Sequence, residues 1–305
     1  MALAGEKGLG RYLVVALPYV WLLVLFLAPF LIVFKISLSQ DVLAMPPYAP
    51  LLDLSNGWEG FTAFLSELSF ENYVYVLDYQ NEFIEAYASS LVIAGISTVL
   101  LLLVGYPIAY AMARAPRSIQ PTLVMLVILP FWTSFLIRVY AWIGILSREG
   151  LLNHALRGLG VIDEPLEILN TDIAVYIGIV YSYLPFMVLP LYAALEKLDD
   201  TLLEAAEDLG CPPWKAFWTI TFPLSLPGVA AGALLCFIPA VGEFVIPDLL
   251  GGSDTVMIGK VLWTEFTVNR SWTVSAAVAV LLLLVLVIPI VIYQNMQQRQ
   301  MEAEK

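Results

Sequence analysis

The chain has 305 residues, of which 60% are hydrophobic and only 13% are charged, and its formal net charge is −12. With a mean hydropathy of +0.85, this composition excludes an ordinary water-soluble globular protein and makes the bilayer the expected solvent. Polar and apolar residues do not alternate as in barrel strands, so we expect helices, which satisfy their backbone amides within each segment.

Six apolar stretches reach the ~20 residues that cross the hydrocarbon layer. The sequence therefore predicts an all-α membrane protein with six transmembrane helices, at 13–34, 86–113, 121–146, 173–195, 224–250 and 273–293. The first stretch follows Lys7 and Arg11, as a signal peptide would. It is too long for one and is not followed by a small-residue cleavage site, so we expect it to be retained.

An even number of spans places both termini on one side, and the positive-inside rule favours the cytoplasm. The basic residues then expected inside are Lys7, Arg11, Arg114, Arg117, Lys197, Lys215, Arg299 and Lys305. Those expected outside are Lys35 at a boundary, Arg148, Arg157, Lys260 and Arg270. This predicts an N-terminal tail and first helix over 1–35, a periplasmic loop over 36–85, a transmembrane core over 86–293 and a cytoplasmic tail over 294–305.

The first outer loop is acidic and has no base after Lys35. Its acidic residues are Asp41, Asp53, Glu59, Glu67, Glu71, Asp78, Glu82 and Glu85. A negative vestibule would attract cations; the alternative is a loop whose charges only keep it solvated. Residues 45–50 contain three prolines and cannot be helical. Ser69 is expected to cap a short surface helix with one apolar face, formed by Phe70, Tyr73, Val74 and Leu77.

Two spans contain residues that are unusual in a membrane. Gly105 and Pro107 permit a kink in the second span, and small residues permit close helix contact. Arg138 in the third span is costly in lipid, so it should face a polar partner or water.

A polar, helix-forming interval at 196–223 separates two spans. Thr201 and Glu204 have capping-box spacing, and Gly210 before two prolines ends the helix. A second helix is expected from Pro213, with Trp214, Phe217 and Trp218 on one face. Acid and exposed apolar surface together favour a docking site for a soluble partner; a re-entrant or self-packed loop is the alternative. Cys211 here and Cys236 in a span should lie at different depths, so no disulfide is expected.

The fifth span is interrupted by three prolines, and broken helices at membrane depth are tolerated where they line a cavity. If the helix enters at Leu224, its rise of 1.5 Å per residue places Glu243 roughly 28 Å along it, near the outer face. We therefore expect Glu243 at an outer gate or vestibule. Asp248 is expected nearby, with an ordinary interfacial acid as the alternative.

Catalytic chemistry is absent from the sequence. One histidine, His154, offers no paired ligand for zinc. Gly259-Lys260 is a failed phosphate-loop pattern, because Asp254 occupies the glycine position and Val261 the Ser/Thr position. We expect no enzyme, no catalytic residue, no metal and no cofactor bound by this chain.

The 196–223 interval resembles the cytoplasmic coupling loop of ABC-importer permeases. Its signature residues are Glu204, Ala205, Ala206, Gly210, Ile220 and Pro223, with Phe222 in place of the usual leucine. The stretches LPFWTSFLIR at 129–138 and FIPAVGEFVIP at 237–247 resemble the permeases of bacterial polyamine importers. The larger permease subunits of putrescine importers are most similar, with those of spermidine/putrescine importers next.

This resemblance implies a type I ABC importer permease fold, with its type-1 transmembrane core over 86–293, in the bacterial inner membrane. It implies a second homologous permease, an ABC ATPase dimer docked on 196–223 and a periplasmic polyamine-binding protein, with ATP and Mg held by the ATPase. No nucleic-acid partner is expected. The implied function is ATP-driven import of a polyamine, putrescine first. The alternatives are import of another solute, such as spermidine or a different ion, and a stand-alone secondary transporter.

A diamine needs carboxylates for its ammonium groups and aromatic faces for cation–π contact and methylene packing. The candidates for such a path are Glu243, Asp248, Trp132, Tyr140 and Trp142. For each aromatic residue, packing against a neighbouring helix is the alternative.

Overall fold

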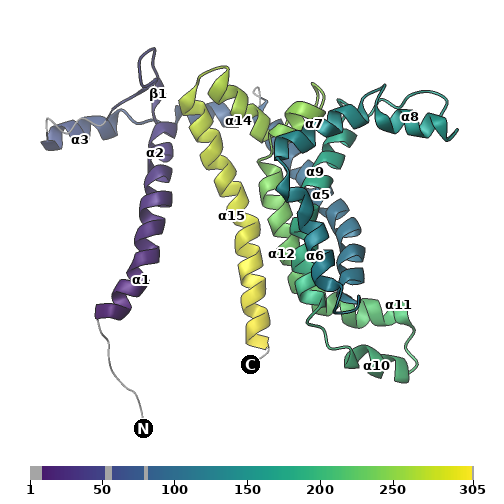
Figure 1. Cartoon of the computed structure of the whole chain (residues 1–305). Coiled ribbons are helices and arrows are strands. Elements are labelled where there is room, and N and C mark those ends of the chain that lie inside the picture. Colours follow the sequence, from purple (N-terminus) through teal and green to yellow (C-terminus); the bar gives the residue numbers. More distant parts are fainter. Residues whose placement is uncertain (1–8, 52–56, 79–81, 304–305) are drawn as a thin grey trace, which may run out of the picture. The chain divides into compact units, whose positions relative to one another are not determined.

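The computed structural model describes residues 9–51, 57–78 and 82–303, so Lys7, Asp53 and Lys305 lie outside the described residues. Contacts divide the chain into two units, Met1–Asn81 with Leu262–Leu283, and Glu82–Val261 with Leu284–Lys305. The described residues contain five helices long and apolar enough to cross a membrane, or six if one bent pair is a single span. The expected all-α membrane class is confirmed (Figure 1).

Unit 1 begins with an apolar helical stretch that passes through one π-helical turn. Its elements are α1 (Leu9–Leu22), η1 (Leu23–Leu27), α2 (Ala28–Ser37), β1 (Gln40–Asp41), β2 (Tyr48–Ala49), α3 (Gly57–Ser66) and α4 (Glu71–Leu77). The two short strands pair antiparallel, Gln40 opposite Ala49 and Asp41 opposite Tyr48. The proline-rich stretch 45–50 is thus non-helical, as expected, and it closes a hairpin that the sequence did not predict.

Helix α4 is fastened to the end of α2. The Asn72 side chain donates hydrogen bonds to the carbonyls of Ser37 and Ser39, at 2.8 and 2.7 Å. Ser69 was expected to cap this helix, but the N-cap is Phe70. Ser69 Oγ still accepts a long hydrogen bond from the Glu71 N–H at 3.5 Å, while the Ser69 N–H bonds to the Leu38 carbonyl at 2.9 Å and holds the residue in the connection before the helix. Val76 is buried, whereas the expected apolar face is largely exposed at Phe70, Val74 and Leu77.

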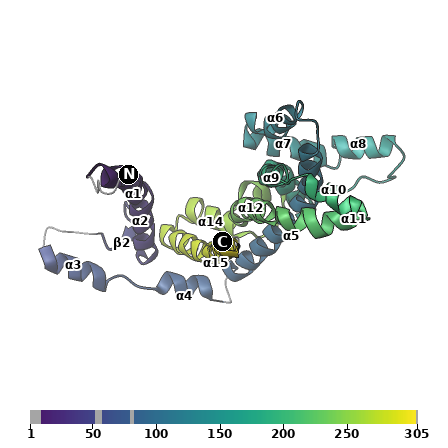
Figure 2. The same cartoon turned by 90° about the horizontal axis from the view of Figure 1, so that it is seen from below.

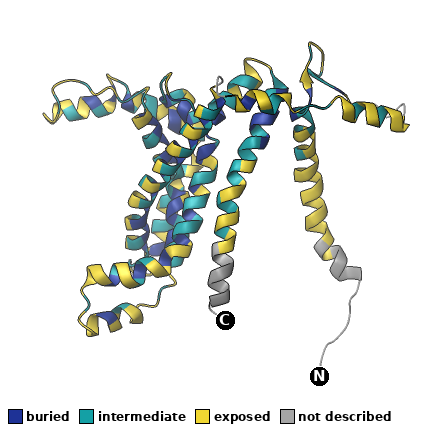
Figure 3. Cartoon of the chain, turned by 180° about the vertical axis from the view of Figure 1, so that it is seen from behind, coloured by how far each residue is buried: buried dark blue, intermediate teal, exposed yellow. Residues whose placement is uncertain are grey.

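The core of unit 2 is built from α5 (Phe83–Ala113), α9 (Asp172–Leu195) and α12 (Phe222–Val241). Figure 2 shows these three helices side by side, and Figure 3 shows their buried residues along the faces that meet. They approach closely at Met187, because a Cβ added at Gly105 or at Gly232 would lie 2.9 Å from that side chain. The small residues therefore serve close helix contact, as the sequence predicted.

The third expected span, 121–146, is not one straight helix. It consists of α6 (Gln120–Ile128), the 3₁₀ turn η2 (Leu129–Trp132) and α7 (Phe135–Leu146), followed by α8 (Leu151–Gly158). The stretches Gln120–Trp132 and Phe135–Gly158 are bent by 87°. Thr133 causes part of the break, because its Oγ1 donates to the Pro130 carbonyl at 2.8 Å and its backbone is extended.

The fifth expected span, 224–250, is wrong at both ends. A helical stretch runs from α11 (Pro213–Ala216) through the π-helical turn η3 (Phe217–Thr221) into α12. It stops at Val241, and α13 (Val245–Leu250) is a separate helix. The connection is shaped by a close backbone approach, since a Cβ at Gly259 would lie 2.4 Å from the Gly242 carbonyl oxygen. The remaining helices are α10 (Thr201–Asp208), α14 (Ile258–Thr267) and α15 (Trp272–Ala303).

Candidate functional site

The 196–223 segment, called the coupling segment from here on, forms an elbow of α10 and α11 at one end of α9 and α12 (Figure 1). Gly210 ends α10 at a φ of 77°. Its N–H bonds to the Glu207 carbonyl at 2.8 Å, and the Cys211 N–H bonds to the Ala206 carbonyl at 2.9 Å. This pair of bonds is a Schellman motif, which requires the left-handed residue that glycine supplies.

The start of α10 differs from the expected capping box of Thr201 and Glu204. The N-cap is Asp200. The Thr201 N–H donates to Asp199 Oδ1 at 3.0 Å, and this bond lowers the pKa of the Asp199 carboxyl. The capping box does not form because the helix begins one residue earlier than predicted, and the Thr201 N–H that Glu204 would have to bond already donates to Asp199.

The coupling segment exposes both acid and large apolar side chains. Leu209 is 88% exposed and Trp214 is 70% exposed. Glu204, Glu207 and Asp208 are exposed as well, whereas Ala206 is buried. A self-packed loop would cover such apolar groups, so the geometry of the segment favours a surface open to a partner.

The other signature residues take two environments. Ala205 is exposed beside Glu204. Ile220 is half-buried in η3, and Pro223 is exposed in the first turn of α12, directly after the π-helical turn. Cys211 is half-buried and Cys236 buried, and both are free thiols.

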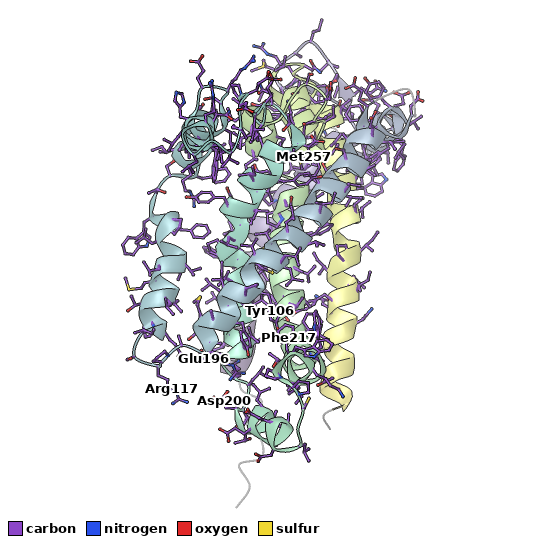
Figure 4. All side chains as sticks on the ribbon, turned by 90° about the vertical axis from the view of Figure 1, so that its right-hand side faces the viewer. Tyr106, Arg117, Glu196, Asp200, Phe217 and Met257 are labelled. Atoms are coloured by element: carbon purple, nitrogen blue, oxygen red, sulfur yellow. The ribbon has the colours of Figure 1, made fainter. Side chains whose placement is uncertain are left out.

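Phe217 is not on an exposed face with Trp214 and Trp218, as the helical spacing predicted. Its ring meets the edge of Tyr106 at 5.5 Å between centroids and that of Tyr110 at 6.1 Å. Tyr106 itself is buried, and its hydroxyl bonds to Ser225 Oγ at 2.8 Å. Figure 4 shows Tyr106 and Phe217 beside each other at this end of unit 2. The π-helical turn at Phe217 shifts the helical register, which spacing in an ideal α-helix cannot anticipate.

A cavity of about 620 Å³ lies between the 114–120 connection and the start of the coupling segment. Its charged and amide residues are Arg114, Arg117, Gln120, Glu196 and Asp200. Arg114 forms an ion pair with Asp200 through Nη1. Gln120 closes the connection by donating to the carbonyls of Ala113 and Ala115, at 3.2 and 3.0 Å. Sequence reasoning did not single out this cluster, because its members lie up to 86 positions apart.

Glu243, the first candidate for a substrate path, is only 7% exposed. Its Oε1 lies 3.1, 3.0 and 3.4 Å from the N–H groups of Phe244, Val245 and Ile246. Its Oε2 accepts a hydrogen bond from the Tyr183 hydroxyl at 2.6 Å. The carboxylate therefore caps the N-terminal end of α13, where the exposed amides favour a negative group.

The other four candidates are spread over η2, α7 and α13. Asp248 is exposed, with Oδ1 4.0 Å from Lys260 Nζ. Trp132 and Tyr140 are 75% and 57% exposed. Trp142 packs edge-on against Tyr181, with centroids 5.4 Å apart, which is the packing alternative for that residue.

Arg138 was expected to face a polar partner or water. It is 8% exposed, and its Nε has no hydrogen-bond partner among the described residues. Its guanidinium carbon lies 5.2 Å from the ring centroid of Phe131 and 5.9 Å from that of Phe135. Two aromatic rings are therefore electrostatic partners of this cation.

The chain is similar to known transport proteins in both sequence and fold. Residues 103–302 match the family described as "Binding-protein-dependent transport system inner membrane component". The chain belongs to this family. It is a multi-pass inner membrane transport subunit and not an enzyme, and ATP hydrolysis belongs to a separate ATPase. A stand-alone secondary transporter does not agree with this membership.

Relatives match most of the chain. The spermidine/putrescine transport system permease protein PotB of Haemophilus influenzae is 40% identical over 283 residues, covering 92% of this chain and 91% of the relative. PotB of Escherichia coli K12 is 43% identical over 239 residues, covering 76% and 87%. The molybdenum transport permease ModB of Azotobacter vinelandii is 32% identical over 164 residues, covering 54% and 71%.

Solved structures confirm the importer permease fold. A chain of a bacterial alginate ABC transporter, solved in complex with its pentasaccharide-bound periplasmic protein, has a TM-score of 0.68 at 16% identity and covers 95% of this chain and 94% of that one. A chain of the MetNI methionine ABC transporter has a TM-score of 0.54 at 17% identity, covering 71% and 94%.

Proposed function

We propose that this chain is the permease subunit of an ATP-driven importer that moves a polyamine, putrescine first, across the inner membrane. The observation that carries the proposal is the 40% identity to a spermidine/putrescine permease over 92% of the chain. A molybdenum transport permease matches at lower identity and over only 54% of the chain. Spermidine is the second candidate substrate, because the relatives' names give both polyamines.

A cationic substrate also suits the side chains at the candidate path. Asp248 offers a solvated carboxylate, and Trp132 and Tyr140 offer exposed aromatic faces. We assign these three to direct substrate contact. We assign Trp142, which packs on Tyr181, and Glu243, which caps α13, to shaping the path at its outer gate.

The coupling segment is the proposed docking site for an ABC ATPase dimer in the cytoplasm, with both chain termini on that side. Its exposed Leu209 and Trp214 would enter a groove of the ATPase, with Glu204 at the edge of the contact. A second homologous permease would complete the pathway, and a periplasmic polyamine-binding protein would deliver substrate to it. The chain itself would bind no cofactor, with ATP and Mg on the ATPase.

The substrate is tested with the complete importer reconstituted in proteoliposomes that contain ATP. We expect uptake of labelled putrescine, competed by unlabelled putrescine or spermidine and not by molybdate or sulfate. Competition by either anion with no effect of the two polyamines would overturn the assignment of substrate class.

A further inference from the structure

One face of the last turns of α5 contacts both ends of the α10–α11 elbow. Tyr106, Tyr110 and Arg114 are spaced four residues apart, so they follow one another along a single helical face. Arg114 reaches the residue before α10, while the two tyrosines reach the helix that leaves the elbow. All of these contacts lie within unit 2.

The contact at the entry of the elbow is an ion pair between Arg114 and Asp200. The Arg114 guanidinium also lies 5.6 Å from the ring centroid of Tyr110, and this contact keeps the Arg114 side chain along the same face of α5. Asp200 is well exposed, so the ion pair by itself is weak in free energy. Its role is to set the direction in which the first turn of α10 leaves α9.

The contact at the exit is an aromatic cluster with one hydrogen bond. Phe217 and Phe222 surround the Tyr106 ring, at 5.5 and 5.9 Å between centroids. The Tyr106 hydroxyl continues the contact into α12 through Ser225. Because packed aromatic interiors do not deform continuously, Phe217 cannot shift alone without carrying Tyr106 with it.

The chain already joins the coupling segment to α9 and α12, whereas α5 meets it only through side chains. We propose that Tyr106, Tyr110 and Arg114 form a clamp through which a displacement of the coupling segment also moves α5. Tyr106 and Phe217 are its principal positioning residues. The inference rests on the proposed docking of an ATPase on this segment. With the clamp intact, α5, α9 and α12 move together and ATP closure opens the pathway.

The test uses the complete importer and three measurements: capture of the ATPase by the tagged permease, ATP hydrolysis, and substrate taken up per ATP hydrolysed. We expect Phe217→Ala and Tyr106→Leu to keep ATPase capture and to lower uptake per ATP about fivefold or more, as for a lost coupling between two sites. Trp214→Ala, which removes an exposed ring from the same segment, should instead lower ATPase capture.

Two milder variants distinguish the loss of a specific contact from general misfolding. Tyr106→Phe removes only the hydrogen bond between Tyr106 and Ser225 and keeps the packing. Ser225→Ala removes this bond and also the bond from Ser225 Oγ to the Phe222 carbonyl at 2.9 Å. The double variant should therefore lower uptake per ATP no further than Ser225→Ala alone. Arg114→Ala, which removes the ion pair with Asp200, should also lower uptake per ATP. Arg117→Ala is its matched control, because Arg117 lines the same connection and forms no ion pair within the described residues. The clamp would be overturned if Phe217→Ala, Tyr106→Phe and Ser225→Ala all captured the ATPase and all took up as much substrate per ATP as the parent. If the parent protein itself failed to capture the ATPase, the proposed docking would be refuted instead.

Discussion

At the scale of single residues, the chemistry of a side chain depends on what its atoms already bind. Glu243 has the charge that a cationic substrate would need, but both of its oxygens accept hydrogen bonds within the chain. Gly210 has no side chain at all, yet its φ of 77° makes it difficult to replace. Both residues act by fixing the direction in which a neighbouring helix begins or ends.

Glu243→Ala leaves the Tyr183 hydroxyl and the first amides of α13 without their acceptor. We expect a loss of about 1 to 3 kcal/mol for the buried group left unpaired, with a lower Tm in detergent and weaker uptake. Glu243→Gln keeps an amide oxygen for the backbone N–H groups, so its Tm should fall less while uptake still decreases. Asp248→Asn is the matched control for stability, because Asp248 is solvated. A Tm of Glu243→Ala equal to that of the parent would contradict the capping role.

Gly210→Val should disturb the end of α10, since an L-residue in the left-handed region costs about 1 to 2 kcal/mol. Gly210→Pro should disturb the end of α10 more strongly, because it also removes the N–H that bonds to the Glu207 carbonyl. We expect both proteins in the membrane with ATP-dependent uptake in vesicles reduced several-fold. Gly95→Ala is the control, since a Cβ there has nothing within 4 Å. Parental uptake by both Gly210 variants would show that the Schellman end is dispensable.

At the scale of elements, close contact between helices holds the core of unit 2 together. Gly228 and Gly232 are one turn apart on α12 and face α9, where a Cβ at Gly228 would lie 2.5 Å from the Ala194 Cβ and 2.9 Å from the Pro190 carbonyl oxygen. This small-xxx-small spacing lets two backbones approach in lipid, where van der Waals packing drives helix association.

Gly228→Val should separate α12 from α9, because the backbone of α9 cannot give way to the added methyl groups. Overpacking of this kind costs about 1 to 3 kcal/mol, so thermal unfolding in detergent should shift to lower temperature. Gly144→Ala in α7 meets nothing within 4 Å and should leave the Tm unchanged. Equal Tm values for the two variants would argue against this packing.

At the scale of the whole molecule, the energy for transport comes from a separate ATPase, for which we propose the coupling segment as the docking surface. The exposed α10 carries acid and apolar groups together, and the family to which the chain belongs uses a separate ATPase. Residues 36–85 contribute eight acidic side chains to the net charge of −12.

Glu204→Lys reverses a charge at the centre of α10 without touching any buried residue. We expect normal membrane insertion, lower capture of the ATPase and loss of ATP-driven uptake in vesicles. The control is Glu164→Lys, an exposed acid outside the coupling segment, which should behave as the parent. Full uptake by Glu204→Lys would remove this residue from the docking surface.

The sequence by itself determined the features that depend on composition and local conformation. Runs of ~20 apolar residues indicated the spans. Gly210 before Pro212 and Pro213 marked the end of α10, because only glycine adopts the required φ without strain. The spacing of Glu204, Ala205 and Gly210 was enough to indicate the family, since such a motif is local.

The tertiary structure alone decided the features that need a partner distant in the chain. The second oxygen of the Glu243 carboxylate is occupied by the hydroxyl of Tyr183, 60 positions away. Phe217 lies inward because Tyr106 and Tyr110, more than 100 positions earlier in the chain, pack against it. Periodicity describes one ideal helix at a time, so it cannot show which face a neighbouring helix will cover or where a side-chain hydrogen bond will end the helix.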